Sequence, residues 1–290
     1  MRVLTIINGY SISEDILRFS AQITHRANDL ITQMTVIALI KSHPALVAET
    51  TIDNIKRQFF GLQASIRICH SLAEIIREAE EGEYDLVITE EKHSSKFMSV
   101  IKDSTAIRIA ENVPCSVLIF KALAHPINRI LLCDSGAENS QAVRQFATLL
   151  TDLLDGEQEI TVLHVMSQIS AGPGVRGKQL RAEIEELIQE HTPEGELLKR
   201  DMDVLDQRGV HPTPKVRHGL VVDEILAEAH NGAYDLVVIG AHHQEGWQHF
   251  LLDNIAHKII THIDRSVLVI KSRRLTSFPA RRPSVYRPKG

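Results

Sequence analysis

The sequence predicts an α/β protein in which one doubly wound domain occurs twice. Each copy has a five-stranded parallel sheet, and the two copies form a pseudo-twofold dimer within the chain. Three observations predict this arrangement. The 290 residues exceed what one hydrophobic core usually organises. The two halves repeat each other, and in each half short apolar segments rich in β-branched residues alternate with amphipathic segments.

The internal repeat is clearest near the end of each half. Residues 84–121 align without a gap on residues 234–271, so that Tyr84 matches Tyr234 at an offset of 150. At the start of each half the offset is 127, where Arg2 matches Arg129. The second half therefore carries an insertion of roughly twenty residues, which we place at residues 172–195 and expect to lengthen a helix and its loops.

Strands are expected at short apolar segments bounded by turn residues. The expected strands are residues 3–7, 34–40, 64–68, 86–89 and 116–120 in the first half, and residues 130–133, 160–165, 215–218, 236–240 and 266–270 in the second. Residues 14–31 are typical of the helices between them. Because nearly continuous apolar strands alternate with helices, each sheet should be parallel and covered on both faces. Ligands of such sheets bind beyond the carboxyl ends of the strands.

The boundaries follow from the same reading. We expect one domain at residues 1–122, a second at 127–272, and a basic tail at 273–290. The last strand of each domain would leave an exposed apolar edge, so we expect these two strands to pair with each other. The tail carries six basic and no acidic residues, which predicts a flexible extension; the alternative is a basic arm that touches nucleic acid or acidic lipid.

Bulk composition excludes several classes of protein. The net charge of -5 gives no general attraction to nucleic acid or to an anionic membrane. Neither a signal peptide nor an apolar segment of membrane-spanning length is found. The three cysteines are widely spaced, which argues against a disulfide framework or a cysteine-rich zinc site. We therefore expect a cytoplasmic protein with no membrane or nucleic-acid partner.

Two segments carry a family resemblance. Residues 235–271 resemble the carboxyl-terminal signature of universal stress proteins, and residues 129–143 resemble that family's first strand and loop. The resemblance covers nearly the whole chain twice, so that the chain is similar to a tandem universal stress protein. ATP-binding members have a Gly-x-x-Gly loop after the fourth strand, followed nine residues later by Gly-Ser or Gly-Thr. Such glycines let backbone N–H groups approach phosphates at the start of a helix.

This chain departs from that pattern in both halves. In the second half Gly240 and Gly246 match loop glycines, but His243 replaces the second glycine and Asp253-Asn254 replaces the Gly-Ser pair. In the first half the equivalent positions are Glu90, His93, Lys96, Asp103 and Ser104. The aspartate that the family uses after its first strand is Asn8 or Ser135 here, with Asp134 one position earlier. Carboxylates near the expected phosphates disfavour ATP, so we expect no cofactor.

The second half therefore holds the candidate ligand site. Side chains and backbone from the two loops should line it: Asp134, Ser135, Gly240, His242, His243, Gly246 and Asn254. These groups suit a neutral or weakly polar ligand, which Trp247 could cover. We expect the histidines between 242 and 262 to be solvated; the alternative is a zinc site that includes Asp253 and His257. Cys133 is expected to pack in the core.

These observations predict a non-catalytic stress-response protein that acts as a ligand-binding or interaction platform. Its partners would be the other half of the chain, an unknown small molecule or protein, and a further copy in a homodimer. One alternative is an ATP-binding, nucleotide-sensing module that uses the second domain. Another is an enzyme of the wider nucleotide-binding α/β group, but we find no catalytic side chain for it.

Overall fold

A computed structural model of the chain describes residues 1–9, 13–26, 31–40, 45–91, 104–121, 127–134, 154, 158–166, 192–207, 211–241 and 254–271. Strands and helices alternate throughout. In the first half they are β1 (Arg2–Asn8), α1 (Glu14–Arg26), β2 (Gln33–Leu39), α2 (Ala45–Gln58), β3 (Ala64–Cys69), α3 (Leu72–Glu81), β4 (Leu86–Glu90), α4 (Thr105–Asn112) and β5 (Ser116–Phe120). In the second half they are β6 (Arg129–Asp134), β7 (Glu159–Met166), α7 (Pro193–Asp206), β8 (Thr213–His218), α8 (Val221–Asn231), β9 (Leu236–Ala241), α9 (Asn254–His262) and β10 (Ser266–Lys271).

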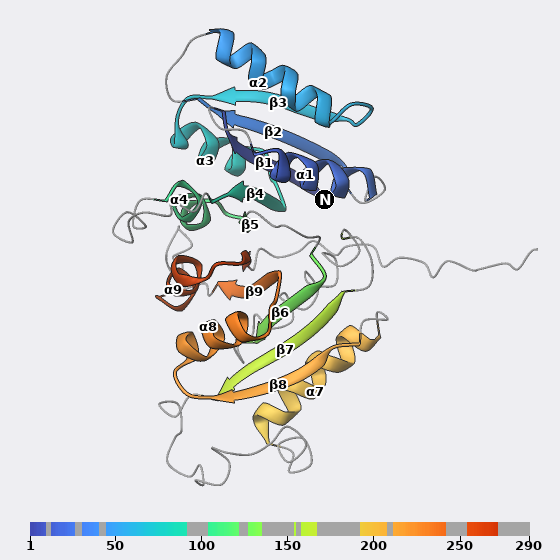
Figure 1. Cartoon of the computed structure of the whole chain (residues 1–290), viewed down its shortest axis with the longest axis vertical. Coiled ribbons are helices and arrows are strands. Elements are labelled where there is room, and N and C mark those ends of the chain that lie inside the picture. Colours follow the sequence, from blue (N-terminus) through green and yellow to red (C-terminus); the bar gives the residue numbers. More distant parts are fainter. Residues whose placement is uncertain are drawn as a thin grey trace, which may run out of the picture.

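The described strands form one continuous ten-stranded sheet in the order β3-β2-β1-β4-β5-β10-β9-β6-β7-β8. Figure 1 shows this sheet twisting along the length of the molecule, with β3 near one end and β8 near the other. Every neighbouring pair is parallel except β5 and β10, which are antiparallel. The sequence predicted two five-stranded sheets whose last strands pair. Backbone hydrogen bonds between β5 and β10 join these two sheets into one.

The seam between the halves has a specific register. Leu118 of β5 pairs with Leu268 of β10, flanked by the pairs Ile119 with Val267 and Val117 with Val269. Leu118 and Leu268 are equivalent positions of the repeat, so the central residue of each strand faces its own counterpart. A twofold relation between two identical strands requires such a register. The strand contact expected from the exposed apolar edges is therefore present.

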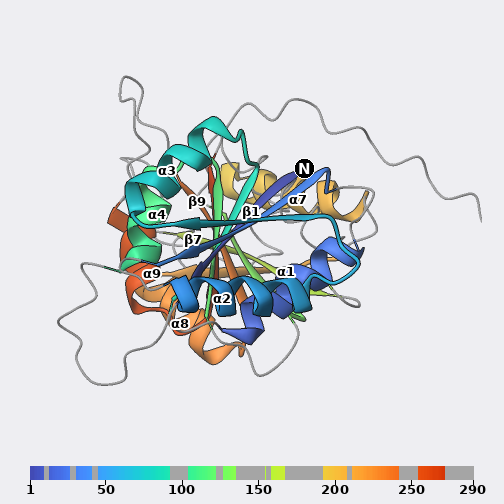
Figure 2. The ribbon, with the colours of Figure 1, turned by 90° about the horizontal axis from the view of Figure 1, so that it is seen from above.

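Two apolar layers cover the sheet. On one face, Ile16 of α1, Ile55 of α2 and Leu198 of α7 pack against the strands. On the other face, Ile75 of α3 and Ile259 of α9 do so, together with residues of α4 and α8. Figure 2 shows α3, α4 and α9 on one side of the sheet and α1 and α7 on the other. Helices on both faces are what right-handed crossovers between parallel strands produce.

Local differences from the expected elements have simple causes. Strand β8 begins at Thr213 and contains Pro214, which is tolerated because β8 is an edge strand. Helix α7 begins at Pro193 after Thr192, whose hydroxyl accepts the N–H of Gly195 at 3.1 Å. Most of the expected insertion, like the end of the expected helix 14–31 and the tail, lies outside the described residues. No helix among those described is long and apolar enough to span a membrane.

Candidate functional site

The sheet divides at two places along its carboxyl edge. Strand β6 pairs with β9 only from Ile130 to Leu132, yet it stays paired with β7 as far as Asp134. Strand β9 stays paired with β10 as far as Ala241, so β6 and β9 part at their carboxyl ends. Strands β1 and β4 part in the same way after Ile6. Doubly wound sheets bind their ligands at such points, beyond the carboxyl ends of the strands and where the strand order reverses.

In the first half, a carboxylate spans the place where these strands part. Glu90 is the last residue of β4, and its Oε1 accepts the N–H of Asn8, the last residue of β1, at 3.5 Å. The following Gly9 is held on both sides, because its N–H donates to the carbonyl of Leu39 and its carbonyl accepts the hydroxyl of Thr51, both at 3.0 Å. The first half therefore bridges its own opening with a carboxylate.

In the second half, Gly240 takes the place of Glu90 at the repeat offset of 150. It pairs with Ile270 and contributes only backbone to the crevice. The structure brings three predicted site residues to this edge: Asp134 ends β6, Gly240 lies near the end of β9, and Asn254 begins α9. The other predicted site residues lie outside the described residues: Ser135, His242, His243 and Gly246, as does Trp247.

Two helices that begin at the carboxyl edge of the second half's strands start with exposed apolar residues, where the first half has polar ones. Leu220 precedes α8 and is 55% exposed, and Ile255 in the first turn of α9 is 40% exposed. Their counterparts in the first half are His70 and Thr105. Single exposed apolar side chains are common on protein surfaces, so what singles out these two is their place at the start of helices on this edge. Sequence reasoning missed these residues, although the repeat alignment contains the polar-to-apolar exchange.

The face covered by α7 differs too. His164 of β7 is 8% exposed and pairs in register with Asp134, and Asp201 on the inner side of α7 is 1% exposed. The equivalent first-half residues are Ala38 and Thr51. Burial of an ionisable group is unfavourable unless the group is hydrogen-bonded or paired with an opposite charge. A sequence reading without strand register could not place His164 beside Asp134.

A carboxylate held by a tyrosine and by basic side chains occurs in both halves, buried in the second and half-buried in the first. Glu228 is 1% exposed and accepts hydrogen bonds from Tyr234 at 2.9 Å, Lys215 at 2.9 Å and Arg217 at 3.0 Å. Burial raises the pKa of Glu228, but these hydrogen bonds outweigh it and the net pKa is lowered. The repeat-equivalent Glu78 accepts hydrogen bonds from the hydroxyl of Tyr84 and from Arg67.. Because this tyrosine–glutamate contact recurs in both halves, we assign it a structural role.

The described residues contain no group of three histidine, cysteine or acidic side chains arranged to hold a metal ion. Of the histidines weighed as zinc ligands, His262 is hydrogen-bonded through Nδ1 to the Lys258 carbonyl at 2.8 Å on α9. His257 lies on the same helix, with its carbonyl accepting the hydroxyl of Thr261. Cys133 is buried, as expected for a packing role.

A parallel sheet with helices on both faces and a dividing carboxyl edge defines the class of doubly wound α/β proteins. The chain belongs to the universal stress protein family, whose model matches residues 126–271. A universal stress protein from Archaeoglobus fulgidus DSM 4304 has a similar fold, with a TM-score of 0.59, 13% identity, and coverage of 93% of this chain and 96% of that one.

A functionally unknown protein from Pseudomonas aeruginosa PAO1 is also similar, with a TM-score of 0.67, 16% identity, and coverage of 93% of this chain and 92% of that one. At these identities the likeness concerns the fold. No curated protein matches the sequence.

Proposed function

We propose that the chain is a non-catalytic, cytoplasmic stress-response protein that binds a small ligand in the crevice of its second half. Membership of the universal stress protein family supports the stress-response role. The observation that carries the binding role is the exchange of Glu90 for Gly240. In the first half a carboxylate reaches across to Asn8, whereas the same strand position in the second half leaves only backbone beside Asp134.

The character of the crevice favours a neutral or weakly polar ligand. Leu220 and Ile255 provide apolar surface at the carboxyl edge, and His164 is a polar group near the end of β7. Pockets that combine apolar walls with a few polar groups suit ligands with an apolar body and one or two hydrogen-bonding atoms. Negative charge at Asp134 and Asp253 disfavours a polyphosphate.

We further propose that the halves are two domains, residues 1–122 and 127–272, which pair as an internal pseudo-twofold dimer. The facing of Leu118 and Leu268 supports this arrangement. We also propose that the chain has no enzymatic role, and that Glu78 and Glu228, which accept matching tyrosine hydrogen bonds in the two halves, have a structural role.

The alternative is a nucleotide-sensing module that holds ATP in the second half. Gly240 favours it, since a residue without a side chain lets a ligand approach the backbone at the end of β9. The two functions differ in the charge of the ligand, so one experiment separates them.

The experiment is mass spectrometry of small molecules released from freshly purified protein. Wild type is compared with Gly240→Trp, which blocks the second crevice, and with Glu90→Trp, the matched change in the first. We expect a neutral or weakly polar molecule from wild type and Glu90→Trp, and none from Gly240→Trp. A released nucleotide would favour the alternative, and loss of the molecule only in Glu90→Trp would place the site in the wrong half.

A further inference from the structure

Each half ends in a buried lysine that reaches into the other half. Lys121 follows β5 and is 3% exposed, and its Nζ donates to the carbonyls of Ile260 at 3.2 Å and Ile263 at 2.5 Å. Lys271 ends β10, and its Nζ donates to the carbonyl of Val113 at 2.5 Å. These carbonyls lie at the carboxyl ends of α9 and α4, where helices leave carbonyls unpaired and where a positive charge is favourable.

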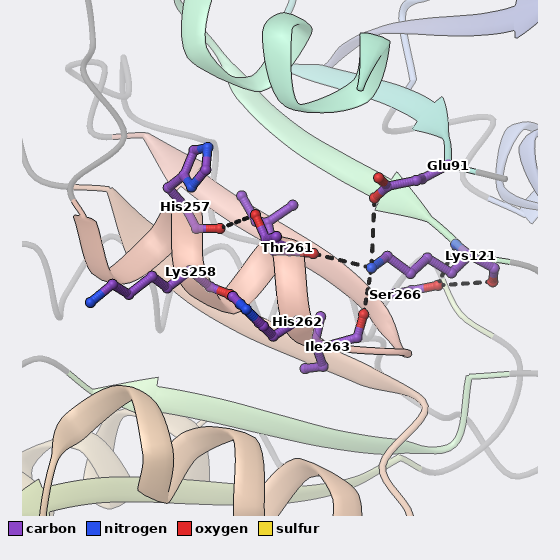
Figure 3. Close-up of polar contacts among 9 residues, drawn as sticks. Glu91, Lys121, His257, Lys258, Thr261, His262, Ile263 and Ser266 are labelled. Carbon is purple, nitrogen blue, oxygen red and sulfur yellow. Dashed lines mark hydrogen bonds and ion pairs between the residues drawn. The ribbon is translucent and has the colours of Figure 1, made fainter. Parts of the chain in front are cut away.

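The backbone of Lys121 is fixed as firmly as its side chain. The Oγ of Ser266 accepts the N–H of Lys121 at 3.1 Å and donates to its carbonyl at 3.3 Å. Ser116 accepts the N–H of Lys271 at 3.3 Å in the equivalent place. Figure 3 shows the Lys121 side chain running from this anchored backbone to the end of α9, with Glu91 on its other side. The lysine therefore links the seam to one particular helix.

The helix that Lys121 holds borders the second crevice. Helix α9 begins at Asn254, at the edge where β6 and β9 part, and has nine residues, so that it is about 14 Å long. Ile255 in its first turn is one of the two exposed apolar residues at this edge. In a helix this short, a displacement of the carboxyl end shifts or tilts the whole helix, including its first turn.

The carboxylate of Glu91 connects Lys121 to the crevice of the first half. Glu91 directly follows Glu90, and its Oε2 lies 3.6 Å from Lys121 Nζ with both side chains largely buried. The N–H of Glu91 donates to the carbonyl of Phe120 at 2.9 Å, which fixes its backbone beside β5. Burial lowers the pKa of Lys121, while the nearby carboxylates of Glu91 and Asp264 oppose that lowering. The residue equivalent to Glu91 is Ala241, so this carboxylate is particular to the arm that reaches α9.

We propose that Lys121, oriented by Glu91, is a positioning residue for α9, through which the first half sets the shape of the ligand crevice in the second. The two halves then have different roles. The first half, whose own crevice is bridged by Glu90, is a regulatory arm, and the second half binds. The inference rests on the proposed function in one respect: the regulated property is ligand retention by the second half.

The test uses hydrogen exchange of the full chain, read by mass spectrometry on peptides that cover α9 and α4. Lys121→Met removes the cap on α9, and Lys271→Met removes the matched cap on α4. Both changes weaken the same seam but remove the cap of different helices, and Lys121→Met also leaves the Glu91 carboxylate without its cation. We expect Lys121→Met to raise exchange in α9 about tenfold, equivalent to about 1.4 kcal/mol, with α4 little changed. Lys271→Met should do the reverse.

Two milder variants, Lys121→Arg and Glu91→Gln, keep the proposal testable if Lys121→Met unfolds the protein. Lys121→Arg keeps the cation and should restore protection of α9, whereas Glu91→Gln should raise exchange in the same direction as Lys121→Met but less. Equal exchange of both helices in both methionine variants would overturn the proposal, as would unchanged exchange in α9.

The molecule released from the purified protein provides the second readout. It should be lost from Lys121→Met and kept by Lys271→Met, and retention by both variants would contradict the regulatory role. If wild type releases no molecule, the proposed function fails, and the exchange of α9 still decides whether Lys121 positions that helix.

Discussion

Lys271 makes the stability of the chain depend on pH in a defined direction. Burial lowers the pKa of Lys271 from 10.5 to about 8, although Cys115 and Glu111 oppose this. Below pH 8 the lysine is charged in both folded and unfolded chains, and the folded state bears the full cost of burying the charge. As pH rises above 8, the folded chain loses the proton before the unfolded chain does. Stability from this group therefore increases between pH 8 and 10.5.

The magnitude follows from the shift. A rise of one pH unit above the folded pKa increases the free energy of unfolding by about 1 kcal/mol. The whole interval between the folded and unfolded pKa values increases it by about 3 kcal/mol. Urea unfolding of wild type and Lys271→Met at pH 7 and pH 9 measures it, since the titration of groups that do not interact with Lys271 cancels in the difference between the two proteins. We expect wild type to gain about 1 kcal/mol more than the variant between these pH values. An equal pH response of both proteins would refute the reasoning.

Two further predictions concern the matched halves and the nucleotide. Tyr234→Phe removes a hydrogen bond to the buried Glu228 and should lower the free energy of unfolding by about 1 to 2 kcal/mol. Tyr84→Phe, whose partner Glu78 is the equivalent carboxylate, should behave similarly. Urea unfolding with no loss of stability in either variant would contradict the structural role of these carboxylates. Calorimetry with ATP and magnesium at millimolar concentration should detect weak binding or none, because the sequence has carboxylates at Asp134, the last residue of β6, and at Asp253, in the segment that follows β9. Tight binding would favour the nucleotide-sensing alternative.

The positions of the strands along the chain could be predicted from the sequence because apolar segments are local signals and the repeat shows the same succession of elements twice. Pairing of the last strands also followed from the sequence, since an exposed apolar edge needs a partner. The register of that pairing did not, because the contact of Leu118 with Leu268 joins segments 150 residues apart. Sequence patterns of single strands carry no information about register across such a distance.

The candidate site was predicted only in part. The exchange of Glu90 for Gly240 is visible in the aligned halves. The sequence could not show that the Glu90 carboxylate accepts the Asn8 N–H at the end of the neighbouring strand. The crossing of Lys121 into the other half is equally hidden, because a lysine at the end of an apolar strand usually marks the point where solvent begins. Both features depend on tertiary geometry that neighbouring residues do not encode.

The central claim is that the second crevice is available to a ligand because glycine replaces the carboxylate that bridges the first. Native mass spectrometry of wild type, Gly240→Glu and Glu90→Gly tests it most directly. Gly240→Glu copies the first-half residue into the second half, and Glu90→Gly is the reverse exchange. The account predicts one bound small molecule per chain in wild type and in Glu90→Gly, and none in Gly240→Glu. A molecule that stays bound in Gly240→Glu but is lost in Glu90→Gly would contradict it.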